Sequence, residues 1–147
     1  MTSLKLPVKK LVDSAVVPES AYAGDAGIDL RSTEDITLKP FERKLIPTGL
    51  AMAIPEGYAG FVLPRSGSAI KQGLSLVNAP GLIDSGYRGE LKCIAINLDP
   101  KEPICIQVGD RIAQLVIMRV EQVATQQVDE LSETQRGVGG FGSSGQK

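Results

Sequence analysis

The segment ELKCIAINL, at residues 90–98, decides the fold class of this chain. It is rich in isoleucine and its polar and apolar residues partly alternate, a pattern that favours a β-strand. Similar short runs occur along the chain, separated by glycine and proline. We expect these further strands at residues 4–10, 28–32, 44–54, 60–64, 74–77, 104–108 and 113–123. Many short strands joined by Gly/Pro turns predict an all-β sandwich, barrel or jelly roll.

Two segments depart from this strand pattern. Residues 66–72 form the one helix of note that the sequence predicts, and Ser66 at its start is a suitable N-cap. The last segment, RGVGGFGSSGQK at residues 136–147, has too little apolar surface to order itself. Its single arginine and phenylalanine, Arg136 and Phe141, leave two interpretations open: a disordered end, or a lid that orders over a ligand.

Composition narrows the possible functions. The chain has 147 residues, which favours one domain, and its net charge of −1 gives no basic excess for binding nucleic acid. It contains no histidine, which excludes Ser-His-Asp and Cys-His nucleophiles and histidine-based zinc sites. Cys93 and Cys105 both lie in apolar runs, so we expect two buried thiols without a disulfide. No leader or apolar span is visible, so we expect a cytoplasmic protein that contacts no membrane.

The segment PRSGSA, at residues 64–69, combines a cation, a hydroxyl and a glycine where a strand passes into the expected helix. Backbone N–H groups in such a turn favour an anion, and an arginine adds a bidentate donor. The segment differs from a Walker A loop, which requires a G-x-x-x-x-G-K-[ST] pattern. A phosphate cradle and a simple capped turn with a solvent-facing arginine both fit these residues.

A second candidate segment is NAPGLIDSGYRGE, at residues 78–90. Proline and glycine predict a turn, and Asp84 follows two aliphatic residues that would give its carboxylate an apolar neighbour. Tyr87 offers a flat ring nearby. Asp84 is therefore either a general base or an aspartate that closes a turn. With histidine absent, any general base must be Asp, Glu, Lys, Tyr or a thiolate.

Asp29 lies in AGIDL, at residues 26–30, where a charge enters an apolar strand. A buried carboxylate needs hydrogen-bond donors or a cation beside it, so Asp29 either holds metal-bound waters or accepts hydrogen bonds from a turn. In GDRIAQL, at residues 109–115, we expect Asp110 and Arg111 to pair and brace a turn.

Taken together, the motifs resemble those of the trimeric dUTPase family across essentially the whole chain. The five strings that carry the resemblance, in order, are AGIDL (26–30), PRSGSA (64–69), NAPGLIDSGYRGE (78–90), GDRIAQL (109–115) and RGVGGFGSSG (136–145). The resemblance implies an all-β, jelly-roll-like barrel at residues 1–130, with a flexible Gly-rich C-terminal arm at residues 131–147. It also implies a homotrimer with active sites at subunit interfaces.

The family's reaction is hydrolysis of dUTP to dUMP and pyrophosphate with Mg²⁺, which keeps uracil out of DNA and supplies dUMP for dTMP synthesis. By resemblance, Asp84 activates the attacking water, and Tyr87 lies against the deoxyribose and excludes a 2′-OH. Asp29 is expected to orient waters on Mg²⁺ while the metal binds mainly to the phosphates. The residues expected to bind uracil are Asn78, Gly81, Leu82 and Ile83, with Phe141 stacking on the base. Those expected to bind phosphate are Arg65, Ser66, Gly67, Gln114 and Arg136, with Gly142 and Ser143 beside them in the arm.

Two other functions fit the same scaffold. A dCTP deaminase-type relative would need a glutamate over the pyrimidine C4, and Glu90 is the only glutamate in the third motif. A non-catalytic nucleotide-binding trimer would have no need of Asp84, Ser66, Arg136 or Phe141, yet all four are present.

Overall fold

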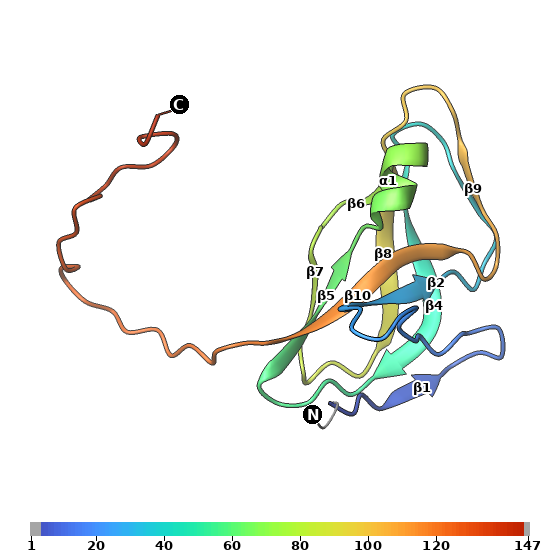
Figure 1. The fold of residues 1–147 in the computed structure, drawn as a ribbon, viewed down its shortest axis with the longest axis horizontal. Helices are drawn as coiled ribbons and strands as arrows, with labels where there is room; N and C mark the ends of the chain where they lie inside the picture. Colours follow the sequence, from blue (N-terminus) through green and yellow to red (C-terminus); the bar gives the residue numbers. More distant parts are fainter. Residues whose placement is uncertain (1–3, 146–147) are drawn as a thin grey trace.

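The structure is a computed structural model that describes residues 4–145, and it consists of β-sheets with one short helix (Figure 1). The first sheet has the order β1 (Val8–Lys10), β4 (Arg43–Met52), β8 (Glu90–Asn97), β6 (Leu74–Leu76). The second has the order β2 (Gly27–Arg31), β10 (Arg111–Arg119), β5 (Tyr58–Leu63), β7 (Gly81–Ile83). A two-stranded sheet pairs β3 (Ile36–Leu38) with β9 (Ile104–Ile106). The all-β, jelly-roll-like prediction is confirmed.

Strand β8 shows why the sequence folds in this way. Its side chains alternate, so that Leu91, Cys93 and Ala95 are buried while Lys92 faces solvent. Buried residues of the second sheet, such as Leu115 of β10, belong to the same hydrophobic cluster. Because alternate side chains point to opposite faces of a strand, the period-two pattern places a single apolar face on this shared core.

Each of the eight expected strands overlaps an observed one, and two observed strands were missed. β3 is only three residues long, and β7 lies in the third motif, which its proline and glycines mark as a turn. Helix α1 (Ser66–Gln72) has the expected bounds, but the prediction that Ser66 caps it is wrong. The N-cap is Arg65, whose guanidinium has no acceptor atom for a capping bond and donates to Asp29.

Helix α1 buries none of its side chains, so its position depends on its C-terminal end. Gly73 ends the helix with a left-handed φ of 70°, and Leu98 N–H donates to its carbonyl oxygen at 2.9 Å. A Cβ at residue 73 would lie 2.9 Å from the backbone nitrogen of Asp99. The side chain of the fully buried Asn97 fixes that loop by donating to Leu38 O and accepting from Asp99 N–H.

The C-terminal segment leaves the sheets after β10. Residues 120–145 contain no helix or strand, and in Figure 1 they run away from the sheets as a single extended trace. The division at residue 130 therefore stays a prediction, because the last strand already ends at Arg119 and no structural change marks residue 131. Among residues 4–145, no helix is long and apolar enough to span a membrane.

The prediction that both cysteines are buried is correct for Cys93 and wrong for Cys105, which is exposed. In β9 the side chains alternate, so Ile104 and Ile106 enter the core and Cys105 between them must face outward. Burial raises the pKa of the Cys93 thiol to about 12. Both thiols are free.

These surroundings predict different reactivity for the two thiols. At pH 8 a disulfide reagent should modify Cys105 in the native protein and leave Cys93 unreacted, because the reactive thiolate is scarce well below a pKa of about 12. Counting thiols with a chromogenic disulfide should give one fast equivalent in buffer and two in denaturant. Two fast equivalents without denaturant would contradict the burial of Cys93.

Candidate functional site

The first group of predicted site residues meets at a hollow of about 480 Å³ beside β2, β10 and the start of α1. Asp29 is central to it. Its Oδ1 accepts a hydrogen bond from Arg65 Nε at 2.8 Å, and its Oδ2 lies 3.3 Å from Arg111 Nε. We call these three residues the arginine cluster. Asp29 and Arg65 are largely buried, with side chains 22% and 28% exposed, whereas Arg111 is 46% exposed.

The arginine cluster corrects one prediction. The expected pair between Asp110 and Arg111 is wrong, because Arg111 reaches across to Asp29 on the neighbouring strand. Asp110 still braces its turn, by accepting from the backbone N–H of Gln107 at 2.8 Å. Sequence reasoning missed Arg111 as a partner of Asp29, since only the β2–β10 pairing brings these two strands together.

Gln114 is held against the same hollow by backbone pairing. It lies between Asp29 of β2 and Leu63 of β5, and its Nε2 donates to Pro64 O at 2.9 Å. Gly27 leaves the space for its amide, because a Cβ there would lie 2.5 Å from Gln114 Oε1. Ser66 and Gly67 line the hollow from the start of α1, and a Cβ on Gly67 would meet only open space.

The electrostatics of the arginine cluster favour an anion. Two guanidinium groups share one carboxylate, so the cluster keeps an excess of one positive charge. No acidic residue stands in the first turn of α1, although the carboxylate of Asp25 also lines the hollow. Arginine presents donors in a planar arrangement that matches phosphate oxygens. Asp29 contacts both guanidinium groups at their Nε atoms, so its contacts leave the terminal nitrogens for a ligand.

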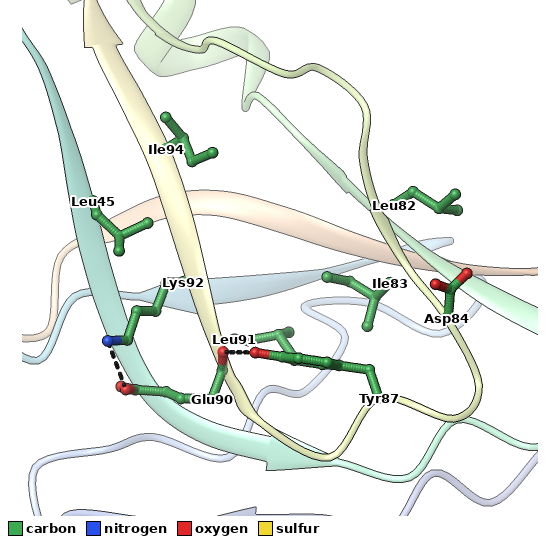
Figure 2. A pocket seen from close by; sticks show the side chains of 9 residues that line it. All are labelled: Leu45, Leu82, Ile83, Asp84, Tyr87, Glu90, Leu91, Lys92 and Ile94. Carbon is green, nitrogen blue, oxygen red and sulfur yellow. Dashed lines mark hydrogen bonds and ion pairs between the residues drawn. The ribbon is translucent and has the colours of Figure 1, made fainter.

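The second group of predicted residues lines a separate hollow of about 490 Å³, which we call the Asp84 hollow (Figure 2). Leu82, Ile83, Asp84 and Tyr87 lie on one side of it. Its full lining is Leu45, Leu82, Ile83, Asp84, Tyr87, Glu90, Leu91, Lys92 and Ile94. The apolar neighbours expected for Asp84 are therefore present. None of these residues also lines the hollow of the arginine cluster.

The acidic groups of the Asp84 hollow differ in their partners. Glu90 Oε1 accepts from the backbone N–H of Gly49 at 3.0 Å, and its Oε2 lies 3.4 Å from Lys92 Nζ. The carboxylate of Asp84 is exposed, and among residues 4–145 no side-chain hydrogen bond or ion pair engages it. Asp84 instead uses its backbone carbonyl, which accepts from Tyr87 N–H at 3.1 Å and closes the turn.

The predicted uracil residues follow one another along the chain beside this hollow. Gly81 is buried at the start of β7, where it pairs with Val62 of β5. A Cβ on Gly81 would lie 3.4 Å from both Val62 Cβ and Asn78 Nδ2, so the amide of Asn78 is folded back over the turn. The Ala79–Pro80 peptide bond between them is cis.

The predicted residues of the arm are not brought to either hollow. Arg136 donates from Nε to Gly139 O at 2.8 Å within its own turn, and the side chain of Phe141 is fully exposed. Gly142 has a positive φ of 88°, and Ser143 N–H donates to Gly140 O at 3.1 Å. Within one chain, the predicted site residues therefore lie in three separate places: the hollow of the arginine cluster, the Asp84 hollow and the arm.

Comparison with known proteins finds relatives over nearly the whole chain. A model of the dUTPase family matches residues 13–145. The deoxyuridine 5'-triphosphate nucleotidohydrolase of Rhodococcus erythropolis (strain PR4 / NBRC 100887) is 54% identical over 142 residues, covering 97% of this chain and 87% of the relative. That of Mycobacterium leprae (strain TN) is 53% identical over 148 residues, covering 97% and 96%.

Solved structures match this chain in both fold and sequence. The dUTPase of Staphylococcus bacteriophage 80alpha with dUPNHPP is 36% identical with a TM-score of 0.89, covering 97% of this chain and 99% of the phage chain. A mutant dUTPase from phage phi11 of S. aureus, described for its coordination of a structural Mg(II) ion, is 32% identical with a TM-score of 0.80 and covers 86% and 98%. The chain therefore belongs to the dUTPase family and is a dUTP diphosphatase.

Proposed function

We propose that this enzyme hydrolyses dUTP by in-line attack of a water on the α-phosphorus, with Asp84 as the general base. The observation that carries the proposal is the free carboxylate of Asp84 in a hollow whose other acid, Glu90, has both oxygens engaged. The chain has no histidine, so a carboxylate is the natural acceptor for the water proton. Attack at the α-phosphorus releases pyrophosphate and leaves dUMP.

The arginine cluster is the proposed phosphate site, together with Ser66, Gly67 and Gln114. A triphosphate carries about four negative charges, and preorganised cations at these oxygens stabilise the charge of the transition state. The two guanidinium groups that line the hollow support this role. Arg111 joins it because its guanidinium lines the same hollow.

The residues present fit Mg²⁺ carried on the triphosphate. Among residues 4–145 no group of three or more His, Cys, Asp or Glu side chains could hold a metal by itself. Asp29 and Asp25 are the carboxylates that line the proposed phosphate site, and Asp29 would hold the metal through its waters. When bound, Mg²⁺ would neutralise charge on the phosphate oxygens.

We further propose that Asn78 and the backbone of Gly81, Leu82 and Ile83 bind uracil, with Tyr87 against the deoxyribose. The strand pairing of β7 supports this, because a backbone fixed in a sheet presents donors and acceptors in a rigid register. A rigid turn rejects the thymine methyl group by shape, although shape alone discriminates by only ~1–3 kcal/mol.

The proposed assembly is a homotrimer in which one active site draws on more than one chain. The Asp84 hollow and the hollow of the arginine cluster share no lining residue, and the arm reaches neither. Hydrolysis needs the base, the phosphate site and the closing arm at one substrate, so a second copy supplies the missing part. Arg136, Gly142 and Ser143 would then bind phosphate and Phe141 would stack on uracil.

The substrate and metal requirements can be tested together. Pyrophosphate release should be fast with dUTP and Mg²⁺, and slow with dTTP, dCTP or UTP. The uracil turn should reject the methyl group of thymine and the 4-amino group of cytosine, and Tyr87 should reject the 2′-OH of UTP. Chelation of Mg²⁺ should abolish most of the dUTP signal. Ammonia release from dCTP would instead indicate a deaminase, and dUTP binding without pyrophosphate would indicate a nucleotide-binding protein.

Replacing the proposed base tests the mechanism. Asp84→Asn should lower kcat by about 10²–10⁴ while dUTP affinity stays within a few-fold, because the amide keeps the shape of the side chain but cannot take the water proton. Single-turnover kinetics and nucleotide titration separate the two effects. Asp13→Asn, an exposed aspartate outside both hollows, is the matched control. Unchanged kcat in Asp84→Asn would remove Asp84 from this role.

Removing the arm tests its closing function. A chain ending at Gln135 should remain a trimer by light scattering, because β1 to β10 all precede the deletion. Its kcat/KM for dUTP should fall by about 10²–10³, since phosphate donors and the uracil stack are lost together. Full activity in the truncated chain would contradict the lid, and a monomer by light scattering would contradict the assembly.

A further inference from the structure

The ring of Tyr87 is held in one position by the two residues at the end of its own turn. Its hydroxyl donates to the backbone carbonyl of Glu90 at 2.9 Å, and Figure 2 shows the side chain reaching from the turn toward β8, below Ile83 in this view. Its backbone N–H donates to Asp84 O at 3.1 Å. The ring is therefore fixed relative to the proposed base as well as to β8.

Gly89 provides the space in which the end of this ring lies. A Cβ at residue 89 would lie 2.5 Å from Tyr87 Oη, 2.7 Å from Cζ and 3.0 Å from Cε2. Contacts this short force a shift, and all three atoms belong to a side chain that can swing away. Gly89 has no positive φ, so an alanine there would displace the ring without straining the backbone.

Glu90 anchors the carbonyl that receives the tyrosine hydroxyl. In the β4–β8 pairing, β4 advances from Pro47 to Ala51 while β8 advances only from Lys92 to Glu90, so the register shifts at this point. Gly49 lies inside the irregular stretch with a φ of 66°, and its N–H donates to Glu90 Oε1 at 3.0 Å. The side chain of Glu90 thus ties the start of β8 to a buried part of β4.

We propose that Gly89 and Glu90 are positioning residues for sugar selection, and that Gly89 sets the distance between the Tyr87 ring and the 2′-carbon of the nucleotide. The inference rests on the proposed role of Tyr87 against the deoxyribose. A ring that rejects one hydroxyl must be fixed to within less than an oxygen atom's diameter, because a hydroxyl is a small group for shape to exclude. The missing Cβ of Gly89 and the carbonyl of Glu90 fix the Tyr87 ring at its hydroxyl end.

The chain offers a matched control in the same turn. A Cβ on Gly86 would meet no atom within 4 Å, and Gly86 likewise has no positive φ. Gly86→Ala and Gly89→Ala therefore make the same chemical change one and two residues from Tyr87, and only the second touches the ring. A difference between these two variants reports on ring position, since backbone flexibility is reduced in both.

The experiment measures kcat/KM for dUTP and for UTP in the full chain and its variants. Gly89→Ala should lower the dUTP/UTP ratio about tenfold or more, while Gly86→Ala keeps the parent ratio. Tyr87→Phe, which keeps the ring but loses the bond to Glu90 O, should lower the ratio by a smaller factor. Glu90→Gln keeps an oxygen acceptor for Gly49 N–H and should keep the ratio, whereas Glu90→Ala should lower it.

The outcomes separate this inference from the proposal on which it rests. Tyr87→Ala with an unchanged ratio would show that sugar selection lies elsewhere, which overturns the role of Tyr87 itself. A lowered ratio in Tyr87→Ala but a parent ratio in Gly89→Ala would overturn only the positioning role. If Gly89→Ala fails to fold by circular dichroism, Tyr87→Phe decides, and a parent ratio in Tyr87→Phe then overturns the inference.

Discussion

The pairing of β4 with β8 is the constraint on which the rest of this structure depends. It joins the longest strand to the strand that follows the third motif, and between Pro47 and Ala51 the two strands leave regular register. The irregular stretch is buried, and Thr48 satisfies its own hydroxyl by donating to Leu91 O at 2.6 Å. A β-bulge of this kind bends a strand and redirects side chains, and here it lies beside the segment that carries Asp84 and Tyr87.

The requirement to satisfy buried polar groups links the core to the chemistry. An unpaired backbone N–H inside the bulge would cost about 1–3 kcal/mol, and the carboxylate of Glu90 removes that cost at Gly49. The same carboxylate is thereby unable to act as a free base. This use of Glu90 in folding supports the proposal that Asp84 is the general base, because the two carboxylates of the hollow differ in their hydrogen bonds.

Much of the secondary structure could be predicted from the sequence, because period-two patterns and turn residues are local signals. The eight predicted strands and the bounds of α1 followed from such signals. β7 could not, because its three residues form a strand only through pairing with β5. The exposure of Cys105 depends on which face of β9 meets the core, and the partner of Arg111 depends on which strands are neighbours. Both depend on tertiary structure, which a local sequence pattern does not determine.

The candidate site shows the same limit. The motifs predicted which residues would carry the chemistry, and the structure places most of them at two separate hollows. The role of Gly27 in making room for Gln114 was not visible, because a missing side chain has meaning only when the neighbouring atoms are known.

The segment that follows β10 can be regarded as a tether. Residues 120–145 would span roughly 85 Å if fully extended, and roughly 30 Å on average as a flexible coil. Both lengths exceed the size of a single hollow, so Phe141 can sample surfaces well beyond its own sheets. A tether of this length keeps its end at an effective concentration near the millimolar range around its attachment point. Even a stacking contact too weak to bind a free peptide would then suffice to hold the end in place, and it would release quickly once pyrophosphate has left and the arm has lost its phosphate contacts.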